Sequence, residues 1–343
     1  MFIKAKAGAS LYFHNACLTN IAICLNLDES NSINYFLDLI VQQKMRNFLI
    51  SLLLICLLSP FLRAQVDSDM PDTLRKKRLN TLIWGGSAFY TTTMTGLYFL
   101  WYADGEQRSF HFFDDNAQWQ QVDKVGHVYS AYHFSRASAE AFRWTGMSPR
   151  KAALWGSLSG IFLMTPIEIF DGFSSNYGAS WGDFIANTSG SALLYAQHAL
   201  WREERLHLKF SFAPSGLASQ RPNVLGNSLH TQILKDYNGQ TYWLSFDVDR
   251  FLPPNTAYPK WLSVAFGYGA QDMLYARPEE NFTQTGLRSY RQYYLGLDLD
   301  LKDIPTKSKF LKKLFFFVNM IKLPAPAVEY NRAQGWRWHW LKF

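Results

Sequence analysis

Three pairs of polar side chains have the types and spacing needed for chemistry at one site. Within each pair the residues are three or four positions apart: Asp123 and His127, Glu168 and Asp171, and Asp183 and Asn187. On a helix this spacing puts both members on the same face. Three helices could therefore direct carboxylates and one imidazole toward a single point. Such a cluster would bind a divalent metal ion through nitrogen and oxygen, or carry out acid–base chemistry with His127 as the proton carrier.

These pairs predict two overlapping sets of site residues. The candidate catalytic groups are His127, Asp123, Glu168 and Asp183. The candidate ligands of a divalent metal ion are the same four residues together with Asp171. The sequence contains no HExxH, P-loop or GxGxxG motif that would add a zinc site or a phosphate cradle. The case for an enzyme therefore depends on this one cluster.

Structural roles compete with these chemical roles. Thr165 to Glu168 and Ser180 to Asp183 both have the form of a capping box at the start of a helix. Asp171 precedes a glycine and could end a helix in a turn. The pair of Asp123 and His127 could hold two helices in register. The histidines outside the cluster are expected at the surface or in packing: His133, His198 and His207.

The elements that would position the cluster are helices over residues 65–205. Residues 79–103 carry no charge until Asp104 and are long enough to cross a bilayer. Residues 119–145 and 180–201 have helical spacing, and Ser148 with Pro149 begins another helix. Gly156 and Gly160 form a GxxxG face for close helix contact. We predict a bundle of four or five helices that is semi-buried or embedded in a membrane.

Residues 206–343 change to the alternating pattern of strands. Apolar side chains fall on one face in residues 244–249 and 293–301, and further strands are expected at 206–212, 261–268 and 336–343. The fold class is therefore α+β, with an antiparallel sheet of about five or six strands after the bundle. The last segment resembles the final strand of an outer-membrane barrel. The number of strands is short of a spanning barrel, so a sheet resting on the bundle is preferred.

The N-terminal residues predict export. Residues 45–64 have a basic start, an apolar run and a small residue at the end, which is the layout of a signal peptide or anchor. Residues 1–44 then form an extension before a second initiator methionine. All three cysteines precede residue 65, which excludes disulfides and thiolate sites from the remaining chain. Cys56 is a poor lipidation site, because Ile55 stands where a small residue is wanted.

Composition points to the cell envelope rather than to nucleic acid. The chain is 48% hydrophobic, 17% aromatic and 18% charged, which excludes disordered, collagenous and disulfide-scaffold classes. Removal of residues 1–64 leaves 29 basic and 24 acidic residues, a net charge of +5. The basic residues gather at 75–78 and 307–313, beside apolar segments. A membrane lipid surface is therefore the expected acidic partner, and no nucleic acid is expected.

The segments Asp123 to His127, Glu168 to Phe173 and Tyr177 to Gly190 resemble the YfiM-like family of predicted periplasmic lipoproteins of unknown function. The elements DKxGH, ExxDG and SxGDxxxNxxG occur in that order over about residues 75–205. A more distant similarity is to VanZ-like membrane proteins. Both resemblances imply an envelope setting and a polar helical core that includes Lys124 and Asn187.

We therefore expect an exported, periplasmic and membrane-associated protein with a structural or binding role. Its β-rich tail would contact the membrane surface or an envelope protein partner. The alternative is an envelope hydrolase acting on a lipid-linked or cell-wall substrate, with His127 as acid or base, Asp123 orienting it, and Glu168, Asp171 and Asp183 binding metal or substrate.

Overall fold

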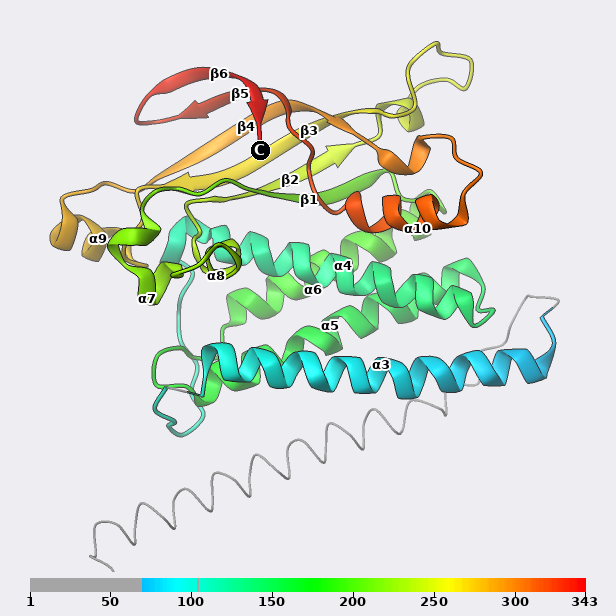
Figure 1. The fold of residues 1–343 in the computed structure, drawn as a ribbon, viewed down its shortest axis with the longest axis horizontal. Helices are drawn as coiled ribbons and strands as arrows, with labels where there is room; N and C mark the ends of the chain where they lie inside the picture. The colour runs from blue at the N-terminus through cyan, green and yellow to red at the C-terminus, as the bar shows by residue number, and fades with distance from the viewer. Residues whose placement is uncertain (1–69, 104) are drawn as a thin grey trace, which may run out of the picture. The chain divides into compact units, whose positions relative to one another are not determined.

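The structure is a computed structural model that describes residues 70–103 and 105–343 (Figure 1). The predicted extension 1–44, the signal peptide or anchor 45–64 and Cys56 lie outside the described residues. The chain divides into two units, residues 1–63 with 80–90 and residues 64–79 with 91–343. The site and the sheet described below lie in the second unit.

Within residues 70–205, four long helices precede the sheet, which confirms the predicted helical first half. They are α3 (Asp72–Trp101), α4 (Val122–Trp144), α5 (Pro149–Phe173) and α6 (Trp181–Leu200). Among the described helices, α5 alone has the length and apolar composition to cross a membrane, and a buried core helix can share both properties. The predicted candidate for a crossing, residues 79–103, falls in α3 instead.

Small residues let α4, α5 and α6 approach closely. A Cβ at Gly156 would meet the backbone of Ala139, and one at Gly160 would meet Ser135. A Cβ at Gly190 would overlap the carbonyl of Val128. The GxxxG face predicted on α5 is thus a contact surface within the protein, where α5 packs on α4.

The helix starts follow the predicted signals in part. Pro149 occupies the first turn of α5, and the Ser180 side chain accepts a hydrogen bond from the Asp183 backbone N–H at the start of α6. The capping box predicted at Thr165 is wrong, because α5 runs on through Pro166. The Thr165 hydroxyl instead donates to the Ile161 carbonyl at 2.9 Å. Glu168 is therefore free of a capping role.

The second half forms one antiparallel sheet of six strands in the order β1 to β6, as predicted. The strands are β1 (Leu206–Phe212), β2 (Gln240–Phe246), β3 (Leu262–Gln271), β4 (Tyr290–Leu299), β5 (Ala325–Asn331) and β6 (Gly335–Lys342). Strand β5 was absent from the prediction. The outer edge of β1 is bridged in parallel at Phe210 by Ile321, from the segment that leads to β5.

Short elements connect these strands, and the first of the 3-10 turns leads into α4 instead. The helices are α7 (Pro222–Leu225), α8 (Leu229–Lys235), α9 (Pro278–Thr285) and α10 (Lys309–Val318). The 3-10 turns are η2 (Gln118–Gln121), η3 (Ala218–Gln220), η4 (Val248–Phe251) and η5 (Leu301–Asp303).

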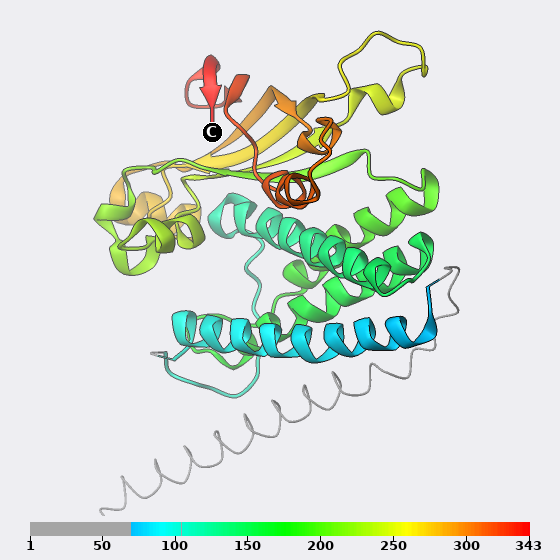
Figure 2. The same cartoon turned by 45° about the vertical axis from the view of Figure 1, so that its right-hand side comes forward.

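Helix α4 lies between the sheet and α5, as Figures 1 and 2 show from two directions. Tyr132 on α4 and Leu194 on α6 pack with Leu208 of β1 in one buried cluster. The Tyr129 ring contacts Phe210 and Tyr242. The sheet thus rests on the bundle, and α4 presents residues to both halves.

Candidate functional site

The polar site begins where the chain enters α4. Trp119, Gln120 and Gln121 all have positive φ angles, of 48°, 49° and 65°. Such angles in consecutive non-glycine residues persist only when the surroundings hold them. Here the sheet half holds them, because the Tyr268 hydroxyl donates to the Gln120 carbonyl and the Trp119 N–H donates to the Ala276 carbonyl at 2.8 Å. This turn places the first residues of α4 against the sheet.

Lys124 is the centre of a group of carboxylates. Its Nζ lies 2.6 Å from Asp115 Oδ2, 2.8 Å from Asp183 Oδ1 and 3.3 Å from Asp123 Oδ2. Burial alone would lower the pKa of Lys124, but Asp123 and Asp183 raise it above its usual value. The ammonium therefore stays charged and joins the loop before α4 to the start of α6.

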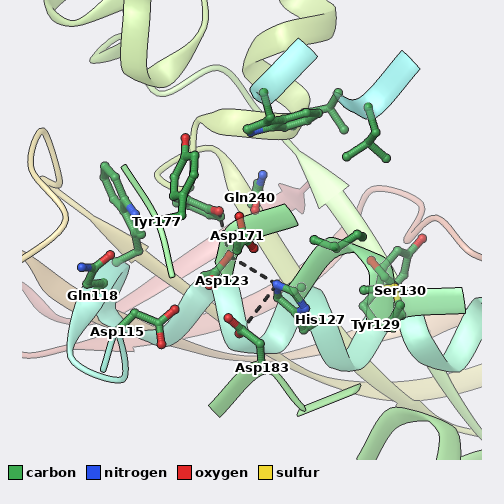
Figure 3. Close-up of a pocket in the computed structure, with 18 of the residues that line it drawn as sticks. Asp115, Gln118, Asp123, His127, Tyr129, Ser130, Asp171, Tyr177, Asp183 and Gln240 are labelled. Carbon is green, nitrogen blue, oxygen red and sulfur yellow. Dashed lines mark hydrogen bonds and ion pairs between the residues drawn. The ribbon is translucent and has the colours of Figure 1, made fainter. Parts of the chain in front are cut away.

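His127 lies one turn along α4 between two sets of partners, of which Figure 3 shows Asp123 and Asp183. Its Nε2 is 3.6 Å from Asp183 Oδ1 and 3.9 Å from Asp123 Oδ1. Its Nδ1 donates to Asn187 Oδ1 at 3.1 Å, because the amide nitrogen of Asn187 donates to Glu168 Oε1 at 3.3 Å. Asn187 thereby fixes the ring, so that Nε2 presents either a proton or a lone pair to the two aspartates.

The proton affinities in the cluster are strongly perturbed. Burial alone would lower the pKa of His127, but Asp123, Asp183 and Glu168 raise it to about 9. Burial raises the pKa of Glu168 to about 8 and, against the opposing effect of His127, that of Asp183 to about 6. Burial would also raise the pKa of Asp123, but His127, Lys124 and the Tyr237 hydroxyl lower it. Near pH 7 the imidazole is thus cationic and Glu168 is mostly neutral.

Asp171 occupies a different position from the other carboxylates. The buried Tyr102 hydroxyl donates to its Oδ1 at 2.7 Å. Within the described part of the chain, no cationic side chain lies within ion-pair distance of it. Burial raises the pKa of Asp171 to about 7, although the hydrogen bond from Tyr102 acts in the opposite direction. Asp171 therefore has no ion-pair partner in this part of the chain, although the charge of His127 also lowers its pKa from a longer distance.

A cavity of about 360 Å³ opens beside these groups. Both halves of the protein line it: α3 to α6 supply helical residues, and β2 with the segment before it supplies Tyr237, Gln240 and Tyr242. The polar lining includes Asp123, His127, Asp171 and Asp183, and Figure 3 shows these residues around one space. Aromatic side chains form much of the rest of the wall: Trp101, Tyr102, Phe113, Trp119, Tyr129, Tyr177 and Phe210.

The structure divides the five residues predicted as metal ligands. Ligand atoms of Asp123, His127 and Asp183 lie within 4.8 Å of one another and could hold a metal ion, which would compete with Lys124 and with the imidazole proton. Glu168 Oε1 lies 3.5 Å from His127 Nδ1, so it contacts the imidazole at the nitrogen that does not face the two aspartates. Asp171 is paired with Tyr102. The predicted polar-core residues Lys124 and Asn187 both contact the cluster.

Sequence reasoning missed several residues that complete this site. Asp115 precedes the helix and also accepts a hydrogen bond from the Ser180 hydroxyl at 2.6 Å. Tyr237 donates to Asp123 Oδ1 at 2.8 Å from more than a hundred residues away. No spacing in the sequence connects such distant positions. The many tyrosines of the chain were only a weak signal that tyrosine hydroxyls take part in a polar site.

A second buried polar cluster joins α4 to the sheet. His207 Nε2 lies 2.8 Å from Asp247 Oδ2 and 3.0 Å from Lys302 Nζ. Burial, and then Lys302, lower the pKa of His207 to about 3, so the ring is neutral. Arg136 of α4 pairs with Glu204 at 2.8 Å in the same region. His207 was expected at the surface or in packing, and it instead lies in this network.

Part of the chain matches a known protein family. Residues 111–199 match the family described as "Predicted periplasmic lipoprotein (DUF2279)". The matched segment contains Asp123, His127, Glu168 and Asp183, and it is consistent with an exported protein of the cell envelope. The match does not confirm the narrower resemblance to YfiM-like or VanZ-like proteins. No curated protein and no solved structure matches the chain.

Proposed function

We propose that this protein is a membrane-associated binding protein of the cell envelope, and that its cavity takes a small ligand with a positively charged amine. The observation that carries the proposal is Asp171, a largely buried carboxyl group on the cavity wall that has no ion-pair partner among the described residues. An incoming ammonium group would supply the missing charge and would keep Asp171 ionised.

The other carboxylates already have their counter-charges. Asp123 and Asp183 face the ammonium of Lys124 and the imidazole of His127. Their charges are therefore largely balanced before any ligand enters. This arrangement leaves Asp171 as the natural partner for a ligand, while Lys124 and His127 hold the surrounding wall in place.

The cavity also suits the body of such a ligand. A volume of about 360 Å³ lies at the small end of the range for small-molecule sites. Tyr102 and Tyr177, whose rings lie 6.1 Å apart, both line the cavity with Trp101. Aromatic faces attract cations, particularly away from water. Carboxyl and rings together favour an amine over a neutral or anionic compound.

Membrane association is supported by α10. This helix exposes Phe310, Leu314 and Phe317, which are spaced to share one face, beside the exposed lysines of the predicted basic segment: Lys307, Lys309, Lys312 and Lys313. Apolar and basic side chains in this combination are typical of helices that lie on anionic membranes.

The test uses matched ligand pairs that differ in charge. Thermal unfolding of the detergent-purified full chain would be followed in two matched comparisons, glucosamine against N-acetylglucosamine and ethylamine against ethanol. Each compound would be added up to about 50 mM, a concentration at which weak binding still raises the midpoint. We expect the amines alone to raise the midpoint, and Asp171→Asn to remove the effect. The exposed Asp114→Asn should leave it intact. Equal stabilisation by charged and neutral compounds, or none by either amine, would refute the proposal.

A second candidate is the envelope hydrolase. The observation that favours it is the separation of pKa values within one cavity: that of Asp123 is lowered, whereas that of Asp171 is raised to about 7. Carboxyl groups with separated pKa values can serve as base and acid. Incubation with peptidoglycan fragments and lipid-linked precursors, followed by mass spectrometry, tests this function. Products that persist in Asp123→Asn and Asp171→Asn would count against it.

A further inference from the structure

The six-stranded sheet has its polarity reversed relative to a sheet of a soluble protein. Its buried face carries charged and polar side chains around a small apolar cluster of Trp243, Ala265, Tyr294 and Ala327. Lys209 Nζ lies 2.7 Å from Asp298 Oδ2, which also accepts a hydrogen bond from the Ser245 hydroxyl at 2.6 Å. Farther along the same face, Gln292 donates to Glu329 at 2.8 Å. The ion pair with Lys209 compensates the buried charge of Asp298, although Asp298 Oδ1 has no hydrogen-bond partner among the described residues.

The opposite face is apolar, and α4 covers only part of it. One row across the strands is set by the register: Leu208, Leu244, Phe266, Leu295, Val328 and Trp338. Leu208 on β1 is 8% exposed beneath the bundle. Phe266, Leu295 and Trp338 on β3, β4 and β6 are 54%, 48% and 53% exposed. In Figures 1 and 2, β5 and β6 lie at the edge of the sheet away from α4.

The neighbouring row consists of aromatic residues on every strand. Its members in register are Phe210, Tyr242, Tyr268, Tyr293, Tyr330 and Trp336. Beyond this row, at the same end of the sheet, are the exposed Arg291 at the start of β4 and Arg332 in the turn between β5 and β6. Within the described residues, neither arginine has a carboxylate partner. The surface thus changes from apolar to aromatic to basic along the strands.

We propose that the outward face of β3 to β6 docks into one leaflet of an anionic lipid bilayer. The order of side chains along the strands matches the layers of a lipid leaflet. The apolar row would face the acyl chains, the aromatic row would lie at the interface that tyrosine and tryptophan favour, and the arginines would pair with the phosphates. From Tyr293 to Leu297 the strand advances roughly 14 Å at about 3.4 Å per residue. That is about half of a hydrocarbon core of ~30 Å. Charge complementarity with phosphate selects lipid over a second copy of this sheet.

The test measures the surroundings of single positions, because other parts of the chain could bring the protein to a membrane. In the full chain with Cys17, Cys24 and Cys56 replaced by serine, an environment-sensitive NBD dye would be attached at Leu295→Cys or Leu297→Cys. The matched control is Thr283→Cys, which is exposed on α9. The vesicles would contain phosphatidylcholine and phosphatidylglycerol at about 7:3, with or without acyl-chain nitroxide quenchers. Unchanged thermal unfolding of each labelled protein verifies folding.

We expect vesicles to shift the emission of both sheet probes to the blue and nitroxide lipids to quench it, more strongly at 297 than at 295, while the probe at 283 stays in water. Arg291→Gln and Arg332→Gln should each weaken partitioning roughly fivefold, and only with phosphatidylglycerol present. Two results would overturn the proposal. One is vesicle-bound protein whose sheet probes remain in water. The other is burial of the probes without vesicles that depends on protein concentration, which would identify a second copy as the occupant.

Discussion

Replacing Asp171 by asparagine should stabilise the protein at pH 8 and leave it almost unchanged at pH 4. Asparagine keeps an oxygen that can accept the Tyr102 hydrogen bond, but it carries no charge. The pKa of Asp171 is raised from 3.8 to about 7 by burial. A raised carboxyl pKa means that the folded state binds this proton more tightly, so stability is lost as pH rises from about 4 to 7.

The size of the gain follows from the same values. At ~1.4 kcal/mol per pH unit, the interval from 3.8 to about 7 corresponds to about 4 kcal/mol. Water in the cavity screens part of this charge, so we expect a gain between about 1 and 4 kcal/mol at pH 8. A gain of this kind is the usual sign of a residue kept for function at the expense of stability.

Urea unfolding at pH 4, 6 and 8 measures the effect as the difference between variant and wild type. Taking the difference removes the titration of groups that do not interact with Asp171, and it retains the electrostatic coupling of Asp171 with Glu168 and His127. Asp114→Asn is the matched control, because Asp114 is exposed and should show no such gain. A loss of stability at every pH would refute the reasoning and would make Asp171 a structural partner of Tyr102. A gain that is equal at all three values would also refute it.

Three other predictions concern the same core. Lys124→Met should lower the free energy of unfolding by about 3 to 5 kcal/mol, because it leaves buried carboxylates unpaired; Lys124→Arg should recover part of the loss in the same denaturation assay. Gly190→Ala should lower it by at least about 1 to 3 kcal/mol through overlap with α4, whereas Gly96→Ala, with open space around it, should be neutral or stabilising. Zn²⁺ should raise the thermal midpoint more at pH 8 than at pH 6, because the ion must displace the Nε2 proton of His127, and His127→Gln should abolish the rise; equal shifts at both pH values would contradict a metal at this ring.

The sequence predicted those parts of the fold that local patterns determine. Pro149 and Ser180 located the starts of α5 and α6, and the alternation in residues 206–212 gave β1 its observed bounds. The spacing of Asp123 with His127, and of Asp183 with Asn187, correctly put four polar side chains on helix faces that meet.

The parts that were missed depend on contacts across long stretches of chain. Strand β5 has Glu329 on its buried face, paired with His339 of β6 at 2.6 Å, so its pattern is polar where a core strand should be apolar. Thr165 and Pro166 looked like a helix start because the sequence alone does not show that α5 continues through the proline. Tyr237 reaches the site only after the two halves have packed together, and Asp115 reaches it from the loop before α4 through its contacts with Lys124 and Ser180.

The bridge between Phe210 and Ile321 has a consequence for the order of assembly. Every strand of the sheet pairs with its neighbour in sequence, so the sheet can grow hairpin by hairpin from either end. The bridge instead joins positions more than a hundred residues apart, with Phe210 N–H donating to Met320 O and Lys322 N–H donating to Phe210 O, both at 2.9 Å. Closing so long a loop is entropically unfavourable until β1 to β4 and α10 are in place. The bridge therefore forms late in folding. Before it forms, the outer edge of β1 is open to pairing with another chain.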